Sequence, residues 1–385
     1  MADAEPIRAP RKRTRTTCAT LPLPDCVALV LQGGGALGSY QAGVIEALEQ
    51  HGVEIDWVAG ISIGAVNAAI VAGNPPERRV ERLREFWSLS ASILPDLPLP
   101  DSDIFREWAH ELSAGVVLAA GVPGFFRPRS LLPQFAVPGS EAALSYYDSA
   151  PLRDTLDRLV DWDRVNQGDV RLSVGAVEIE SGNFRYFDTR TDRIDARHVM
   201  ASGALPPGLP PVEIDGKLYW DGGLVSNTPL IHVLDHQDQA MLVFQCDLFS
   251  ARAERPRTLS DVMGRLTEIR YSSRTRQVTN ERVQLRQERE EIRRVLAKLP
   301  KALCDDPDIV ALRHRADELP VNIVHLIHRP RTWEGANRDF EFSQRTVREL
   351  WQSGHADVTE TIANSAVLAN NIEDGKTAAF DLTRK

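Results

Sequence analysis

The chain has 385 residues, of which 26% are charged and 43% hydrophobic, an ordinary balance for a globular protein. Its net charge of −9 argues against a general nucleic-acid binder, because contacts with phosphate need a surplus of Lys and Arg. The four cysteines lie far apart without metal-ligand spacing, which argues against a disulfide scaffold and a structural zinc site: Cys18, Cys26, Cys246 and Cys304. Composition therefore predicts a soluble, enzyme-sized chain of a reducing compartment.

The first 25 residues are basic, with a run of Arg and Lys between Arg8 and Arg15. No apolar stretch of the length that a secretory signal requires follows this run. The most apolar segment, residues 116–126, is too short to span a bilayer and is interrupted by Pro and Gly. We therefore expect a disordered basic arm over residues 1–25, and a cytoplasmic chain without signal peptide or transmembrane helix. Peripheral membrane contact through the arm is a further expectation.

Strands and helices are expected to alternate once the arm ends. Continuous apolar runs predict buried strands at 27–31 and 53–59, and helical spacing of apolar residues predicts helices at 40–50 and 65–72. Two strands that alternate with two helices within fifty residues are typical of a parallel α/β sheet.

The rest of the chain predicts one large domain with additions. An amphipathic helix is expected at 76–89 and a Pro-rich, irregular insertion at about 90–147. Hairpins are expected at 171–187 and 212–220, the second with an Asp-Gly turn, and apolar strands at 241–246 and 321–328. The charged segment 259–299 and residues 343–365 are expected to be helical. We thus predict a principal domain over 26–250 and a helical C-terminal extension over 251–385 that packs on it.

The first motif is the glycine-rich stretch Gly33-Gly34-Gly35-Ala36-Leu37-Gly38, placed between a strand and a helix. Such a loop directs backbone N–H groups at an anion, either a pyrophosphate or an oxyanion. Dinucleotide binding would need an acidic residue where the second strand ends, but that strand ends at Val58-Ala59-Gly60. The pattern therefore favours an oxyanion.

The second motif, Gly60-Ile61-Ser62-Ile63-Gly64, follows the second strand. A GxSxG sequence between a strand and a helix is typical of a nucleophile elbow, in which a sharp turn exposes the serine hydroxyl. Ser62 is therefore predicted to be a catalytic nucleophile.

A serine nucleophile needs a base, and the downstream histidines His232, His236, His325 and His328 are each predicted to be structural or surface residues. The third motif, Asp221-Gly222-Gly223, directly follows a predicted strand. An aspartate flanked by glycines can approach another backbone closely and accept a proton from serine. Because the reference pKa of Asp is about 3.9, such a base must be desolvated to act near neutral pH.

Together these motifs resemble the patatin-like phospholipase family over roughly residues 26–250: the glycine loop, the elbow, Ala201-Ser202 before a Pro-rich stretch and the Asp-Gly-Gly turn occur in the family's order. The resemblance implies a three-layer α/β/α patatin-like fold with a mostly parallel central sheet. It implies Ser62 as nucleophile, Asp221 as general base and no metal or cofactor. It also implies an oxyanion hole made by Gly33, Gly34, Gly35 and Ala36, with Gly38, Gly60, Gly64, Gly222 and Gly223 shaping the motifs. Leu37 departs from the family, which commonly has Arg or Lys there, and we expect this to lower activity or alter head-group preference.

The resemblance implies a serine lipid acyl hydrolase, similar to a phospholipase A or lysophospholipase, that forms an acyl-enzyme on a lipid or other acyl-ester substrate. The apolar insertion at 104–137 is expected to line an acyl channel or to meet the lipid surface. One alternative keeps the chemistry on other substrates, as a carboxylesterase, thioesterase or polyester hydrolase. Another is a regulatory or binding protein with a patatin fold and weak catalysis. The sequence gives neither head group nor oligomeric state.

Overall fold

The computed structural model describes residues 21–383 except 92–102, 169, 254 and 332–336. The expected basic arm up to residue 20 and part of the insertion lie outside the described residues. The strands are β1 Cys26–Leu31, β2 Trp57–Gly60, β3 Arg127–Pro128, β4 Tyr147–Asp148, β5 Arg171–Glu178, β6 Phe184–Asp188, β7 Val212–Ile214, β8 Lys217–Asp221, β9 Met241–Asp247, β10 Val321–Ile327 and β11 Ala378–Phe380. The longer helices are α1 Gly38–Gln50, α2 Ile63–Ala72, α3 Pro76–Ser90, α4 Asp103–Ala120, α6 Ala150–Leu159, α10 Leu259–Leu296, α11 Pro307–Ala316 and α12 Gln344–Ala363. The shorter ones are α5 Glu141–Leu144, α7 Trp162–Gln167, α8 Ala196–Ser202, α9 Leu230–Asp235 and α13 Ala366–Glu373.

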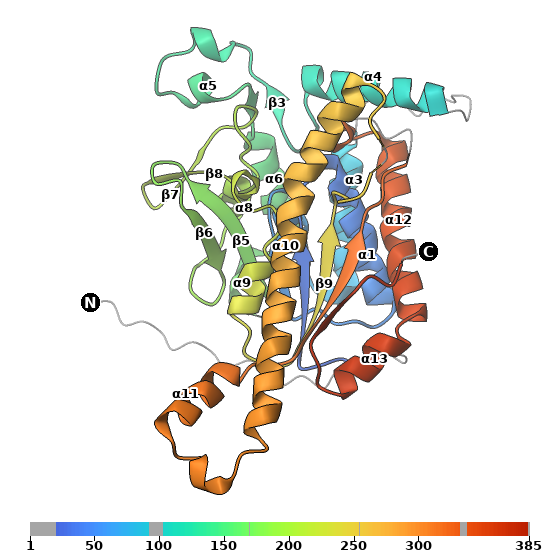
Figure 1. The fold of residues 1–385 in the computed structure, drawn as a ribbon. Helices are drawn as coiled ribbons and strands as arrows, with labels where there is room; N and C mark the ends of the chain where they lie inside the picture. The colour runs from blue at the N-terminus through green and yellow to red at the C-terminus, as the bar shows by residue number, and fades with distance from the viewer. Residues whose placement is uncertain (1–20, 92–102, 169, 254, 332–336, 384–385) are drawn as a thin grey trace.

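A nine-stranded sheet forms the centre of the molecule, in the order β11-β10-β9-β1-β2-β5-β8-β7, with β6 also paired to β5 (Figure 1). Every neighbouring pair from β11 to β5 is parallel, whereas β6 and β8 run antiparallel to β5. The predicted mostly parallel sheet is therefore confirmed, as are both predicted hairpins. The Asp-Gly turn between β7 and β8 has positive φ at Asp215 and Gly216, as a type I′ turn requires.

Helices cover both faces of this sheet. On β1, Val27, Leu29 and Leu31 belong to a large apolar cluster that also contains the buried side chains of α1 and α2. The alternate residues Ala28 and Val30 face the opposite way, into a smaller cluster with apolar side chains of α9. Because successive side chains of a strand point to opposite faces, a strand buried on both sides must be apolar throughout. The predicted three-layer α/β/α arrangement is confirmed.

The segment after residue 250 is mainly helical, but it also completes the sheet. Strand β10, expected at 321–328, pairs in parallel with β9, and β11 pairs with β10. Helix α12 packs along α1, as Figure 1 shows at the right of the sheet. Residues 251–385 thus share the hydrogen-bonded sheet and the apolar core with residues 26–250.

The insertion is more ordered than its composition predicts. Residues 103–120, expected to be irregular, form helix α4, whose Ala114 and Val117 are buried. Beyond α4, residues 127–148 form the short strands β3 and β4 and the one-turn helix α5, a lobe at the upper left of Figure 1. The proline-based expectation fails for residues 103–120 because the prolines lie on either side of this helix rather than within it.

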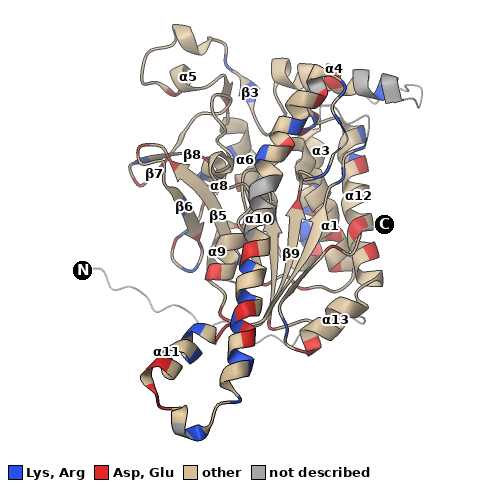
Figure 2. Cartoon of the chain, in the orientation of Figure 1, with Lys and Arg blue, Asp and Glu red and all other residues tan. Residues whose placement is uncertain are grey.

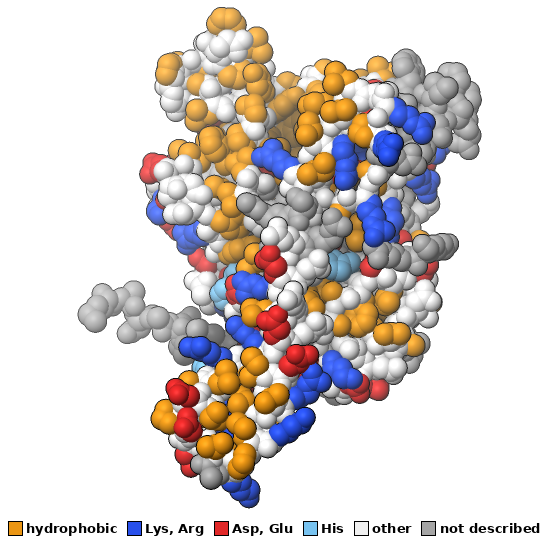
Figure 3. All heavy atoms as spheres, viewed as in Figure 1, with side chains coloured by type: hydrophobic (Ala, Val, Ile, Leu, Met, Phe, Trp, Pro, Cys, Tyr) orange, Lys and Arg blue, Asp and Glu red, His pale blue; other side chains and the backbone are white. Residues whose placement is uncertain are grey.

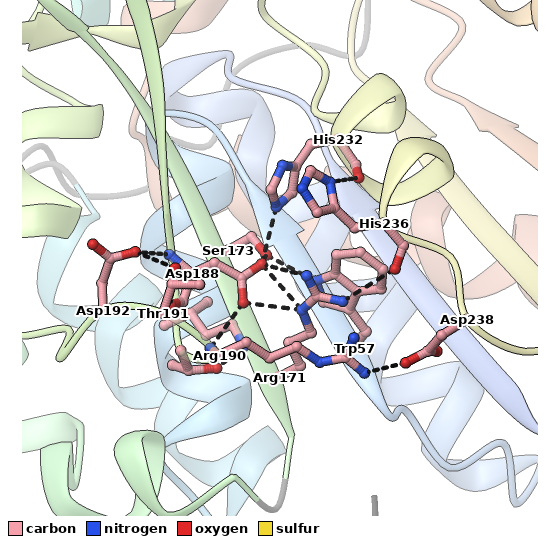
Figure 4. A network of polar contacts seen from close by, with 12 residues as sticks. Trp57, Arg171, Ser173, Asp188, Arg190, Thr191, Asp192, His232, His236 and Asp238 are labelled. Atoms are coloured by element: carbon pink, nitrogen blue, oxygen red, sulfur yellow. Dashed lines mark hydrogen bonds and ion pairs between the residues drawn. The ribbon is translucent and has the colours of Figure 1, made fainter. Parts of the chain in front are cut away.

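A buried polar network joins the amino-terminal ends of β2 and β5 to α9 (Figure 4). The Asp188 carboxylate accepts hydrogen bonds from Ser173 Oγ at 2.7 Å, Arg171 Nη2 at 2.8 Å and His232 Nε2 at 2.9 Å. Burial opposes ionisation of Asp188, but the bonds from His232 and Arg171 outweigh it and hold the pKa of this carboxyl below its usual range. The network lies at the opposite end of β2 from Ser62, so it stabilises the sheet rather than contributing to a site near that serine.

Candidate active site

The predicted nucleophile elbow is a strained turn between β2 and α2. Ser62 has φ 54° and ψ −123°, and it precedes the first residue of α2. The flanking glycines are required by close packing, since a Cβ on Gly64 would lie 2.4 Å from Leu31 O and one on Gly60 would lie 2.3 Å from the carbonyl of Gly64. The backbone N–H of Ser62 donates to Ser202 Oγ at 3.0 Å. Positive φ at a non-glycine residue is typical of functional turns, where the surroundings hold the strain.

Asp221 meets Ser62 from a different part of the sheet. It is the last residue of β8, its side chain is 3% exposed, and it is hydrogen-bonded to the side chain of Ser62. Its Oδ1 accepts from Gly223 N–H at 2.6 Å. Burial raises the pKa of Asp221 to about 6, although the hydrogen bonds from Gly223 and Ser62 favour the ionised form. The desolvation that an aspartate base requires is therefore present.

The glycine loop lies beside the same two residues. It connects β1 to the 3₁₀ helix η1 Gly35–Leu37, and Gly34 and Gly35 are partly exposed. A Cβ on Gly33 would lie 3.0 Å from Ser62 Cβ, so this backbone contacts the nucleophile directly. The first N–H groups of a helix have no partner within it, which leaves them available to an anion. The structure thus brings together the glycine loop, Ser62 and Asp221, the three motifs that the sequence singled out.

Asn227 links the glycine loop to the Asp-Gly-Gly turn. Its side-chain Nδ2 donates to Gly33 O at 2.8 Å, and its backbone carbonyl accepts from Gly33 N–H at 3.2 Å. A Cβ on either Gly33 or Gly223 would lie within 3 Å of Asn227 Oδ1. Sequence reasoning missed this residue, and the only signal was its place in a short polar loop, six residues after Asp221, just before Thr228-Pro229.

The C-terminal segment covers the glycine loop. The 3₁₀ helix η5 Arg338–Phe340 lies against η1, and a Cβ on Gly35 would be only 2.1 Å from Asp339 O. Arg338, almost fully buried, forms an ion pair with Glu268 of α10. These contacts hold η5 between α10 and the glycine loop.

Helix α10 also reaches the site. Burial raises the pKa of Tyr271, the charge of Arg270 opposes the shift, and the charges of Asp221 and Asp339 add to it. Gln32, directly before the glycine loop, donates to Tyr271 O at 3.3 Å. Residues 251–385, predicted only to pack on the catalytic domain, therefore form part of the surroundings of Ser62. No sequence motif marked Tyr271, Glu268 or Asp339.

The histidines considered as bases have other partners. His232 binds Asp188 in the network of Figure 4, and His236 Nδ1 lies 2.9 Å from His232 O. His325 Nδ1 contacts Asp247 Oδ2 at 3.1 Å, and the ring of His328 lies 5.6 Å from that of Tyr40. Asp221 is the carboxyl that contacts Ser62.

Leu37, which departs from the family pattern, is fully buried in the large apolar cluster. A Lys or Arg at this position would need an exit from that core for its charge. The consequence of the substitution for activity remains a prediction.

A buried carboxyl hydrogen-bonded to a serine on a strained turn, beside a glycine-rich helix N-terminus, is an arrangement that can transfer an acyl group. The fold and the site thus have the features of the α/β hydrolytic enzymes that use a serine nucleophile. The family model described as "Patatin-like phospholipase" matches residues 29–234, more than half of the chain. A second family model, described as "Patatin phospholipase", matches residues 269–374. The chain belongs to the patatin-like phospholipase family.

The relatives found by sequence are distant and much longer than this chain. The chain is 28% identical over 241 residues to a lysophospholipase NTE1 of Kluyveromyces lactis, which covers 62% of this chain and 14% of that protein. It is 27% identical over 226 residues to human patatin-like phospholipase domain-containing protein 6, and this alignment covers 58% of this chain and 13% of the human protein. VipD from Legionella pneumophila aligns in structure over 97% of this chain and 83% of that one, with 16% identity and a TM-score of 0.36. The chain therefore spans only about one seventh of these two sequence relatives.

Proposed function

We propose that this protein is a serine lipid acyl hydrolase that cleaves fatty-acyl ester bonds with Ser62 and Asp221. The observation that carries the proposal is the hydrogen bond between the strained Ser62 and the buried Asp221, next to the glycine loop. Membership of the patatin-like phospholipase family supports a phospholipase or lysophospholipase substrate.

The mechanism has two steps. Ser62 Oγ attacks the ester carbonyl and gives its proton to Asp221, while backbone N–H groups of the glycine loop, foremost those of Gly34 and Gly35, bind the developing oxyanion. The tetrahedral intermediate collapses, the C–O bond to the alcohol breaks, and the alcohol takes the proton from Asp221. In the second step water gives a proton to Asp221 and attacks acyl-Ser62. The fatty acid leaves as Ser62 regains its proton.

Labelling by a fluorophosphonate probe tests the nucleophile. We expect intact-mass and peptide analysis to locate one adduct on Ser62, and Ser62→Ala to reduce turnover of a p-nitrophenyl ester by about four orders of magnitude or more. An adduct elsewhere, or turnover by a folded Ser62→Ala variant, would overturn the assignment. A chain-length series of esters, measured beside phosphatidylcholine and lysophosphatidylcholine, separates a lipase from a short-chain esterase or thioesterase.

Turnover is expected to fall as the pH decreases through about 6. Asp221 must be ionised to accept the Ser62 proton, and burial raises its pKa to about 6. Protonation below that pH removes the base, so kcat/KM should decline about tenfold per pH unit. Asp339 is a second carboxyl whose pKa burial raises to about 6, so Asp339→Asn is the control and should keep the acidic limb. A flat profile down to pH 4.5, with the fold intact by circular dichroism, would exclude Asp221 as the base.

A further inference from the structure

The first three turns of α10 carry an apolar stripe that is open to solvent. Its members recur at intervals of three, four and seven residues and therefore lie on one side of the helix. Their exposed fractions are Leu259 78%, Val262 41%, Met263 56%, Leu266 58% and Ile269 47%. Five large apolar side chains on one exposed helix face are more than scattered surface residues, and such a patch marks an interaction site. We call these five residues the α10 stripe.

A second apolar group occupies the same end of the molecule. The lobe after α4 exposes Leu131, Leu132, Phe135 and Val137, the last two by 71% and 74%. Figure 3 shows apolar side chains gathered on both this lobe and the top of α10, with a hollow between them. Strands β9 and β10 point toward this end in Figure 1, and the parallel strands β1 and β2 carry the glycine loop and Ser62 at their corresponding ends.

Positive charge surrounds the α10 stripe, although the chain as a whole is acidic. Arg252, Arg255 and Arg257 in the preceding loop and Arg270 on the helix are all exposed. Among the described residues of the same segment, two carboxylates already have partners: Asp261 accepts hydrogen bonds from the backbone at the helix start, and Glu268 is buried in ion pairs with Arg265 and Arg338. An apolar helix face flanked by arginines is the combination that binds the interface of an anionic membrane.

The α10 stripe lies close in sequence to residues that contact the surroundings of the glycine loop. Ile269 is two residues from Tyr271, whose backbone carbonyl accepts a hydrogen bond from Gln32, the residue directly before the glycine loop. The carboxylate of Glu268 on the same turns binds Arg338, next to the residue that lies on Gly35. A surface seated on this part of α10 would therefore lie beside the segments that pack on the glycine loop.

We propose that the α10 stripe, together with the apolar tip of residues 131–137, inserts into the surface of an anionic lipid bilayer and places the active site against it. The inference rests on the proposed function in one respect, since it explains how a lipid ester would reach Ser62. The occupant is a lipid surface rather than a second protein, because exposed arginines lie directly beside the exposed apolar side chains of the stripe. Such arginines can bind phosphate head groups while the apolar side chains enter the bilayer.

Flotation with vesicles tests this surface. Wild-type protein is expected to bind vesicles of phosphatidylcholine with phosphatidylglycerol, to bind pure phosphatidylcholine more weakly, and to lose affinity as salt increases. Met263→Glu/Leu266→Glu should lower binding at least tenfold, because the wild-type Met263 and Leu266 side chains would be transferred from water into the bilayer and this apolar burial would be lost. Arg255→Glu/Arg270→Glu should lower binding to the anionic vesicles by about fivefold or more per arginine.

A matched control is available at the opposite end of the molecule from the α10 stripe. Val295, next to the last residue of α10, and Val310 of α11 are 59% and 50% exposed. Figure 1 shows α11 and this end of α10 on the projecting arm below the sheet. Val295→Glu/Val310→Glu adds the same charge and removes a similar apolar area, and it should bind vesicles as the wild type does.

A soluble short-chain ester keeps this test distinct from that of the proposed function. Met263→Glu/Leu266→Glu should hydrolyse it at the wild-type rate while losing vesicle binding and hydrolysis of vesicle lipid. Unchanged vesicle binding by this variant would overturn the inference and leave the dyad standing. Light scattering tests self-association. If the wild type is a dimer, and the same substitutions make it monomeric without an effect on vesicle binding, the stripe is a self-association surface instead.

Discussion

Replacement of Asp221 by Asn is expected to abolish ester hydrolysis and to stabilise the fold. The loss of turnover follows because the amide cannot take the proton of Ser62, and it should amount to about four orders of magnitude. Asn retains the shape of the side chain and an oxygen that can accept the hydrogen bond from Gly223 N–H. The site should therefore keep its geometry while losing its base.

The gain in stability follows from the same burial that tunes the base. The pKa of Asp221 is raised from 3.8 to about 6, so the folded state binds this proton more tightly than the unfolded state does. This contribution to stability is complete below pH 3.8 and is lost as the pH rises through about 6. At pH 7 the buried carboxylate thus lowers the free energy of unfolding by up to about 3 kcal/mol. Asn carries no charge and removes this penalty.

Urea unfolding at several pH values measures the effect. Asp221→Asn should be more stable than the wild type at pH 7, and the difference should shrink toward pH 4. Asp339→Asn is a matched control, because burial also raises the pKa of Asp339 to about 6 but the proposed mechanism does not use it. That variant should gain stability and keep its turnover. A destabilised Asp221→Asn protein would contradict the electrostatic account of this site.

Gly35→Ala is expected to disable the glycine loop. Gly35 has φ +55°, and a Cβ there would lie 2.1 Å from Asp339 O, so the loop or η5 must move. Displacement of the N–H groups that we propose to bind the oxyanion should lower kcat by about 100-fold or more. The substitution should also destabilise the fold by more than the 1–2 kcal/mol that positive φ alone costs a non-glycine residue.

Gly52→Ala separates strain from displacement. Gly52 has φ +70°, but a Cβ there meets nothing within 4 Å. We expect about 1 kcal/mol of destabilisation from the backbone conformation and no change in kcat. Short-chain ester kinetics and urea unfolding of both variants provide the comparison. If the two variants have the same kcat, contact between η5 and Gly35 does not position the loop.

Local patterns were sufficient to predict the elements that carry the motifs. β1 is apolar on both faces, the β7–β8 turn has the sequence that its φ angles require, and Ser62 stands between glycines that the elbow needs. Each of these signals lies within a few residues, where backbone sterics and side-chain period dictate the conformation. Helix α4 was missed because the prolines around it dominated the composition of the insertion.

Long-range contacts were beyond such reasoning. Ser202 binds the Ser62 N–H, Asn227 binds Gly33, and Asp339 lies on Gly35, yet none of these partners is a neighbour in sequence of the residue it contacts. A polar residue in a loop has many possible hydrogen-bond partners, and only the packing of the sheet and of α10 determines which one it contacts.

The sequence by itself determined the class of fold and the three motifs, since these depend on short segments with special backbone requirements. The pairing of Ser62 with Asp221 was an expectation that followed from the resemblance to the patatin-like phospholipase family. Only the tertiary structure decided that residues 251–385 complete the sheet and cover the glycine loop, and that Asp221 is desolvated enough to raise its pKa to about 6. Burial and electrostatic environment depend on which distant segments meet, and that is a property of the folded chain rather than of any one segment.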